Sequence, residues 1–198
     1  DSDGRNPEEV FYDHNFLGNN RVPLCSRVLK AERLQAYYKD CDNLIFGIGP
    51  EEKHRATRLV QVYQTVAVKR QQFCTLEFPL IENNVSKEEV NNWINSTGIK
   101  IPILYELGFE HNNCSGGCVR AGKKHWAHLL SVLPDVYLER ERVEEEFRLY
   151  SGKDVHFFKD ETLKHYRERI EAEDKTAFDF SQEDSAAVEC IGICNLEN

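Results

Sequence analysis

The stretch NLIFGIG, residues 43–49, is a short apolar run that ends in glycines. This form is typical of a buried strand that leads into a loop, as in parallel sheets. Residues 51–60 follow with charged residues on an amphipathic pattern and predict a helix. A second strand, FCTLEFPLI, is predicted at residues 73–81, where Pro79 marks its end. The order strand, helix, strand predicts an α/β layer with a mainly parallel sheet.

Helix-start signals flank this stretch on both sides. Ser26 is predicted to cap a helix that runs to about Tyr38, because apolar residues recur there with a period near 3.6. Ser86 and Glu89 have the spacing of a capping box. The inner face of that second helix is predicted to consist of three residues, Val90, Trp93 and Ile94. Residues 1–24 are polar and turn-rich, so we expect loops there with one short helix.

The character of the chain changes after Gly98. An apolar segment leads into HNNCSGGC, residues 111–118, which predicts a tight loop. Helices are predicted after it at three places, residues 123–133, 134–150 and 161–173. We therefore expect an α/β domain over residues 1–105 and a helical, cysteine-bearing region over residues 106–198, packed on it. Two strands are too few for a doubly wound sheet, so strands are expected to be missing on its N-terminal side.

The length and net charge of the chain argue against some classes of protein. The chain has 198 residues, enough for one domain of ordinary size, and its 25 Lys and Arg against 34 Asp and Glu give a net charge of −9. This charge argues against non-specific binding to nucleic acid or to an anionic membrane, although a local basic patch can still bind phosphate. The apolar runs are far shorter than a membrane span, so a soluble protein is predicted. The sequence contains no methionine, which predicts a fragment, a processed form or missing residues.

The seven cysteines are too few for a disulfide scaffold in a chain of this length. Three N-x-S/T sequons, at Asn84, Asn95 and Asn113, fit secretion, but the odd number of cysteines and their spacing favour a reducing compartment. Two C-x3-C units with intervening glycine can bring four thiolates to one zinc ion or iron–sulfur cluster. These candidate ligands are Cys114, Cys118, Cys190 and Cys194, with Cys25 as a further ligand. The alternative is free thiols in or near the core.

Two groups of charged residues are candidates for anion or nucleotide binding. Residues 117–124 match G-x4-G-K, but Lys124 stands where a P-loop needs Ser or Thr, so a P-loop is not predicted. Arg120 and Lys123 lie near glycine amides and suit an anion, unless they merely begin a solvated basic helix. Glu52 and Arg55 follow the first strand, where open α/β sheets bind ligands. Their spacing is also that of a plain surface pair on a helix.

Four stretches together resemble the phosphoadenosine phosphosulfate reductase-like branch of the PP-loop superfamily, in particular its short bacterial and phage proteins. They are NNRVPLCSRVLK (19–30), IFGIGPEEKHR (45–55), GIKIPILYELGFEHNNCSGGCVRAGKKHW (98–126) and ECIGIC (189–194). The resemblance implies an adenine nucleotide alpha-hydrolase-like (HUP-type) parallel sheet and makes residues 1–105 a partial nucleotide-binding domain. The S-G-G-x-D-S loop that opens such proteins and binds the ATP pyrophosphate is not in this sequence. The family's N-terminal third is therefore expected to be lost from the sequence, to lie on a partner chain, or to be absent from a natural remnant.

The resemblance also implies a function: adenine-nucleotide-dependent sulfur transfer, or sulfonucleotide reduction, with a cysteine-ligated 4Fe–4S cluster or zinc. Arg27 and Lys30 fall where the reductases place basic residues, and Glu52 and Arg55 match the family's E-x-x-R. Cys190 resembles the reductases' terminal nucleophile. Expected partners are an adenine nucleotide, a small-molecule or sulfur-acceptor substrate, and a second copy or partner chain, in the cytoplasm of a bacterium or of a phage host. The rival hypothesis is a non-catalytic remnant that serves as a binding or assembly subunit.

Overall fold

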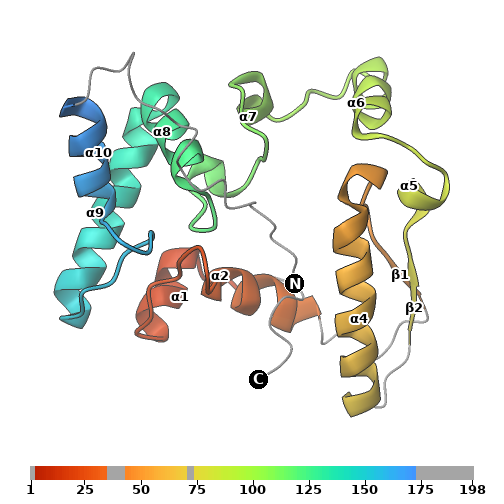
Figure 1. The fold of residues 1–198 in the computed structure, drawn as a ribbon, viewed down its shortest axis with the longest axis horizontal. Coiled ribbons are helices and arrows are strands. Elements are labelled where there is room, and N and C mark those ends of the chain that lie inside the picture. The colour runs from red at the N-terminus through yellow and green to blue at the C-terminus, as the bar shows by residue number, and fades with distance from the viewer. Residues whose placement is uncertain (1–2, 35–42, 71–73, 173–198) are drawn as a thin grey trace. The chain divides into compact units, whose positions relative to one another are not determined.

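The computed structural model describes residues 3–34, 43–70 and 74–172. Within them the chain forms two compact units. The first unit combines residues 3–26 with 102–172, and the second consists of the described part of residues 27–101 (Figure 1). No helix in these ranges is long and apolar enough to span a membrane. The predicted domain boundary at residues 105 and 106 stays a prediction.

The first unit begins with the short helix predicted in the N-terminal segment, α1 (Pro7–Asp13). Asn6 caps it: its side-chain oxygen accepts hydrogen bonds from the backbone N–H groups of Glu8 and Glu9, each 2.9 Å long. The Glu9 carboxylate in turn accepts the backbone N–H of Asn6 at 2.6 Å. This reciprocal capping box fixes where α1 starts.

The helices predicted after residue 122 are confirmed. They are α8 (Lys123–Val132), α9 (Pro134–Ser151) and α10 (Leu163–Ala172), preceded by one turn of helix, α7 (Ile103–Glu106). Pro134 occupies the first position of α9, where a missing N–H costs nothing. Gly152 ends α9 with a left-handed φ of 66°. In Figure 1, α8, α9 and α10 lie side by side.

An aromatic core holds these helices together. Trp126 of α8 is fully buried, with its ring 6.1 Å from Phe157 and 5.7 Å from Tyr137 of α9. The Tyr137 hydroxyl donates a 2.7 Å hydrogen bond to the carbonyl of Leu163, at the start of α10. From the N-terminal segment, Phe11 adds its ring at 6.4 Å from Phe157. Burial of this much aromatic surface is the main favourable term for the first unit.

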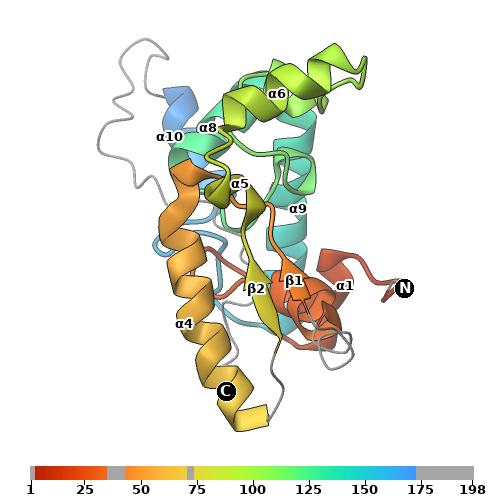
Figure 2. The same ribbon diagram turned by 90° about the vertical axis from the view of Figure 1, so that its right-hand side faces the viewer.

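The second unit contains the predicted parallel strands, β1 (Asn43–Ile45) and β2 (Thr75–Glu77), joined through a 3-10 turn, η2 (Pro50–Glu52), and a helix, α4 (Lys53–Arg70). Asn43 pairs with Thr75 and Ile45 with Glu77. Buried Leu59 of α4 packs against four partly buried residues, Phe46, Val62, Leu76 and Phe78. Figure 2 shows α4 running alongside the two strands. The described structure is thus a helix-rich α/β fold with a small parallel sheet.

The sheet differs from the prediction in length and in burial. Each strand has three residues, and the helix that follows β1 runs to Arg70 rather than to residue 60. The prediction of a fully buried first strand is wrong: Ile45 is 68% exposed, and the Asn43 amide donates to the Glu77 carboxylate on the same side of the sheet. The reason is that α4 packs on the other side, that of Leu76. As predicted, β2 ends before Pro79, which begins a short helix, α5 (Pro79–Glu82).

The capping box at Ser86 is confirmed at the start of α6 (Lys87–Ser96). The inner face predicted for this helix is wrong, because α6 buries none of its residues and Trp93 is 71% exposed. Amphipathic spacing shows which residues share a face, but burial also needs a partner for that face.

The prediction that Ser26 caps a helix is also wrong. The helical segment starts two residues earlier with α2 (Leu24–Ser26) and continues as a π-helical turn, η1 (Arg27–Ala31). Pro23 precedes it, and the fixed φ and missing N–H of proline favour a helix start at that point. The predicted end at Tyr38 lies outside the described residues.

Candidate site at the cysteine loop

The cysteine loop, residues 113–118, has an uncommon backbone. Cys114, Ser115 and Gly116 follow one another with φ angles of 49°, 53° and 91°, all in the left-handed region. The first of them begins a 3-10 turn, η3 (Cys114–Gly116), and the N–H of Gly117 donates to the Cys114 carbonyl at 3.0 Å. The loop itself was predicted, but its left-handed residues were not, and Asn113 before them has an ordinary φ of −99°. Two non-glycine residues in this region cost roughly 1–2 kcal/mol each.

The cysteine loop packs tightly against neighbouring side chains at its two glycines, Gly116 and Gly117. A Cβ atom on Gly116 would lie 2.8 Å from Cδ1 of Leu129, and one on Gly117 would lie 2.7 Å from Nε of Arg140. Arg140 also forms an ion pair with Glu8 of α1 at 2.7 Å. A Cβ atom at Gly116 would therefore press on Leu129, and one at Gly117 would displace the Arg140 side chain, so the packing favours glycine at both positions of the C-x3-C spacer.

Two histidines of α8 support the loop, and neither was predicted as a site residue. Nε2 of His125 lies 2.6 Å from the Gly116 carbonyl oxygen, and Nε2 of His128 lies 2.8 Å from the Leu107 carbonyl oxygen. The ring of Phe109 lies 5.1 Å and 4.5 Å from these two imidazoles. Burial lowers the pKa of His125, against the opposing effect of its bond to Gly116. The i, i+3 spacing of the two histidines was the signal available in the sequence.

The predicted cysteine ligands are only partly within the described residues. Cys114 is exposed, Cys118 is buried and Cys25 is half-buried, all three in the first unit. Over the described ranges no three Cys, His, Asp or Glu side chains come together as a metal site. Cys190 and Cys194 lie outside those ranges, so the four-cysteine site stays a prediction.

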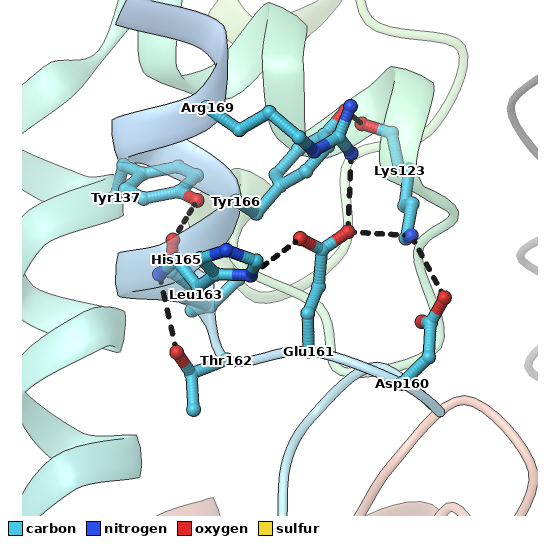
Figure 3. Close-up of polar contacts among 9 residues, drawn as sticks. All are labelled: Lys123, Tyr137, Asp160, Glu161, Thr162, Leu163, His165, Tyr166 and Arg169. Carbon is cyan, nitrogen blue, oxygen red and sulfur yellow. Dashed lines mark hydrogen bonds and ion pairs between the residues drawn. The ribbon is translucent and has the colours of Figure 1, made fainter. Parts of the chain in front are cut away.

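The basic residues that follow the loop bind groups of the chain itself. Arg120 donates to the carbonyl of Asn20 at 2.8 Å. The Lys123 ammonium lies 2.6 Å from the carboxylate of Glu161 and 3.3 Å from that of Asp160 (Figure 3). Burial alone would lower the pKa of Lys123, but these two carboxylates raise it above its ordinary value. An anion at Lys123 would therefore compete with both carboxylates.

The Glu161 carboxylate contacts three basic side chains, as Figure 3 shows. Besides Lys123, its carboxylate oxygens lie 3.1 Å from Nη2 of Arg169 and 3.2 Å from Nδ1 of His165. The Tyr166 ring lies 5.7 Å from the Lys123 ammonium and 5.1 Å from the Arg169 guanidinium. Burial opposes ionisation of Glu161, but Lys123 and Arg169 outweigh it and lower its pKa. The loop that precedes α10 is thereby fastened to the first turn of α8.

The candidate nucleotide residues of the second unit also have partners within the chain. Glu52 and Arg55 follow β1 as predicted, and they form an ion pair with each other, which matches the alternative of a plain helix pair. Arg27 lies 3.4 Å from Glu32. Lys30 is exposed at the end of the same turn of helix. The six predicted nucleotide-binding residues thus divide between the two units.

Comparisons with protein-family models, with curated proteins and with solved structures found no match to this chain.

Proposed function

We propose that this chain is a PP-loop-type protein of sulfur or nucleotide metabolism that acts in adenine-nucleotide-dependent sulfur transfer or sulfonucleotide reduction. The HUP-type sheet belongs to the same proposal, and the parallel β1–α4–β2 unit is compatible with it. The conformation of the cysteine loop is the observation that carries the proposal. Non-glycine residues in left-handed conformations are concentrated at functional sites, where the surrounding structure holds them.

The cysteine loop meets that description in three respects. Cys114 has a left-handed φ and an exposed side chain. Gly116 is packed on Leu129, and its carbonyl lies at hydrogen-bond distance from His125. The thiol of Cys114 is therefore held at the surface by a backbone that has little freedom to rearrange. A position fixed in advance is what a metal ligand or a reactive thiol requires.

The chemistry of the thiols fits a soft metal. Cys114 and Cys118 would hold it with Cys190 and Cys194, and Cys25 would be a further ligand. Thiolates select zinc or iron–sulfur clusters over magnesium or calcium. A bound 4Fe–4S cluster would supply electrons for the reduction of a sulfur centre. In the alternative arrangement Cys25 replaces Cys190 as the fourth ligand, and Cys190 is proposed as the nucleophile. Its thiolate would form an S–S bond to the sulfur of a sulfonucleotide, while the S–O bond to the nucleotide phosphate breaks and the nucleotide leaves.

Metal analysis of the full chain, purified without oxygen, tests this site. We expect a brown protein that contains iron and sulfide, and loss of both in Cys114→Ser and Cys118→Ser. Cys74→Ser is the matched control, because Cys74 is a half-buried cysteine of the second unit, and it should retain the metal. Colourless protein with zinc would indicate a structural metal site. The proposal is wrong if neither metal is found and every thiol reacts with a thiol reagent in the folded protein.

Nucleotide binding is tested separately with ATP by titration calorimetry. Arg55→Gln is expected to weaken ATP binding by roughly tenfold or more, the worth of one charge-assisted hydrogen bond. Arg142→Gln is the matched control, because Arg142 also forms an i, i+3 pair, with Glu139. Equal affinities of both variants and the wild-type chain would remove Arg55 from the nucleotide site and leave the metal test unaffected.

A further inference from the structure

Glu144 of α9 is a buried carboxylate that the proposed function does not use. It is 1% exposed, deeper than any other charged side chain in the described ranges. Its Oε1 accepts the backbone N–H of Phe157 and its Oε2 accepts that of Leu163, each at 2.7 Å. One side chain thus binds both ends of residues 157–163, the segment that leads into α10.

We propose that Glu144 is a proton-controlled clamp: its ionised carboxylate holds both ends of residues 157–163 on α9, and its protonation releases one end.

The reason lies in the hydrogen-bonding capacity of the two forms. An ionised carboxylate has two acceptor oxygens, and here each faces one backbone N–H. In the protonated form one oxygen carries the proton, and this hydroxyl oxygen is a much weaker acceptor for a backbone N–H than a carboxylate oxygen. A backbone N–H bond at Phe157 or Leu163 must therefore weaken when Glu144 takes up a proton.

The surroundings of Glu144 bring this change near neutral pH. Burial raises its pKa to about 7, although the two N–H bonds and the nearby His156 and Arg148 act in the opposite direction. Arg148 and His156 are held instead by Asp154, which lies 2.7 Å from Arg148 and 3.0 Å from His156. The third ionisable neighbour, Tyr137, has its pKa raised by burial and stays neutral. Within the described residues Glu144 forms no ion pair that would keep it charged.

The clamped segment connects this proton to the candidate site. Phe157 and Phe158 contribute rings to the core around Trp126. Glu161, in the middle of the segment, holds Lys123 at the start of α8 (Figure 3). Release of one end at lower pH therefore loosens the support of Lys123, five positions after Cys118 in the sequence.

Amide hydrogen exchange of the full-length protein, followed by NMR between pH 6 and pH 8.5, tests the clamp. After correction for intrinsic exchange rates, we expect the protection of Phe157 or Leu163 to rise about tenfold with pH, the equivalent of one hydrogen bond. The carboxyl carbon of Glu144 should titrate with the same midpoint. In Glu144→Gln one of the two amides should exchange fast at every pH, because the side-chain NH2 is a donor.

Glu145→Gln is the control, since Glu145 is the exposed neighbour on the same helix, and it should retain the wild-type profile. If the protection of both amides in the wild-type protein does not change with pH, the proposal is overturned. A Glu144 carboxyl that titrates at the ordinary value near 4.5 would overturn it as well. Both readouts use the wild-type chain, so they stand even if Glu144→Gln does not fold.

Discussion

At the scale of single residues, two glycines with positive φ, Gly116 of the cysteine loop and Gly152 at the end of α9, separate two causes of strain. Gly116 has a positive φ and no room for a Cβ atom, whereas Gly152 has a positive φ with no atom within 4 Å of the Cβ position. We expect Gly152→Ala to lower the free energy of unfolding by about 1 kcal/mol, the conformational cost alone. Gly116→Ala should cost roughly 2–4 kcal/mol, because the contact with Leu129 adds to it. Denaturant unfolding of both variants measures the difference, and equal losses would contradict the packing at Gly116.

His125 gives a prediction about pH at the same scale. Burial holds its pKa below the ordinary 6.5, so the folded chain binds its proton less readily than the unfolded chain does. Stability must therefore rise with pH through this range, and it is lost as the pH falls below about 6.5. His125→Gln cannot titrate, so the stability difference between wild type and variant isolates this residue from groups such as Glu144. We expect the wild-type chain to lose stability relative to the variant between pH 7 and pH 5. A constant difference over that range would show that the His125 pKa is unshifted.

The sequence predicted the features of this region that depend on neighbouring residues, but not the contacts between distant ones. It predicted the loop at residues 111–118 and the start of α9 at Pro134, because glycine, cysteine spacing and proline act locally. It did not predict that Lys123 binds Glu161, because that partner is 38 positions away and is brought near only by packing of the helices. The left-handed angles at Cys114 and Ser115 were also missed, since neither cysteine nor serine has a local preference for this region of the backbone.

At the scale of elements, α6 depends on its cap more than on packing, because it buries no residue. The Ser86 hydroxyl accepts the N–H of Glu89 at 3.1 Å, and the Glu89 carboxylate accepts the N–H of Ser86 at 2.8 Å. Ser86→Ala should cost about 1 kcal/mol and unfold the first turn locally. Hydrogen exchange of residues 88–91 should accelerate about fivefold, while the core amides of α9 stay unchanged.

Asn92→Ala is the control for the cap, because Asn92 is exposed within the same helix. Alanine favours helix, so this variant should keep or slow the exchange of the first turn. If both variants exchange alike, the cap does not determine the stability of α6. The cap of α6 could be predicted because it depends on four consecutive residues, 86–89. The exposure of Trp93 could not, because its burial would need a packing partner, and the periodicity of α6 does not show whether one is present.

At the scale of the whole molecule, the division into two units gives a test of its own. Phe11 is buried in the first unit against Phe157, whereas Phe16 nearby is exposed. Phe11→Ala should lower the stability of the first unit by about 3–5 kcal/mol, and Phe16→Ala by less than about 1 kcal/mol. Hydrogen exchange should accelerate in α8, α9 and α10 of Phe11→Ala, with α4 of the second unit unchanged. Equal acceleration in α4 would show that the two units unfold as one.

The ion pair between Glu8 and Arg140 has a consequence for synthesis of the chain. The two residues are 132 positions apart, and α1 buries Val10 and Phe11 in the unit that Arg140 belongs to. A ribosome adds about 5–20 residues per second, so on the order of ten seconds pass between the synthesis of α1 and that of its packing partners Arg140 and Phe157. During that interval two large apolar side chains of a nascent chain are uncovered in water. Aggregation or capture by chaperones should therefore depend on translation speed between residues 14 and 157, and synonymous codons that slow this interval should reduce the yield of folded protein.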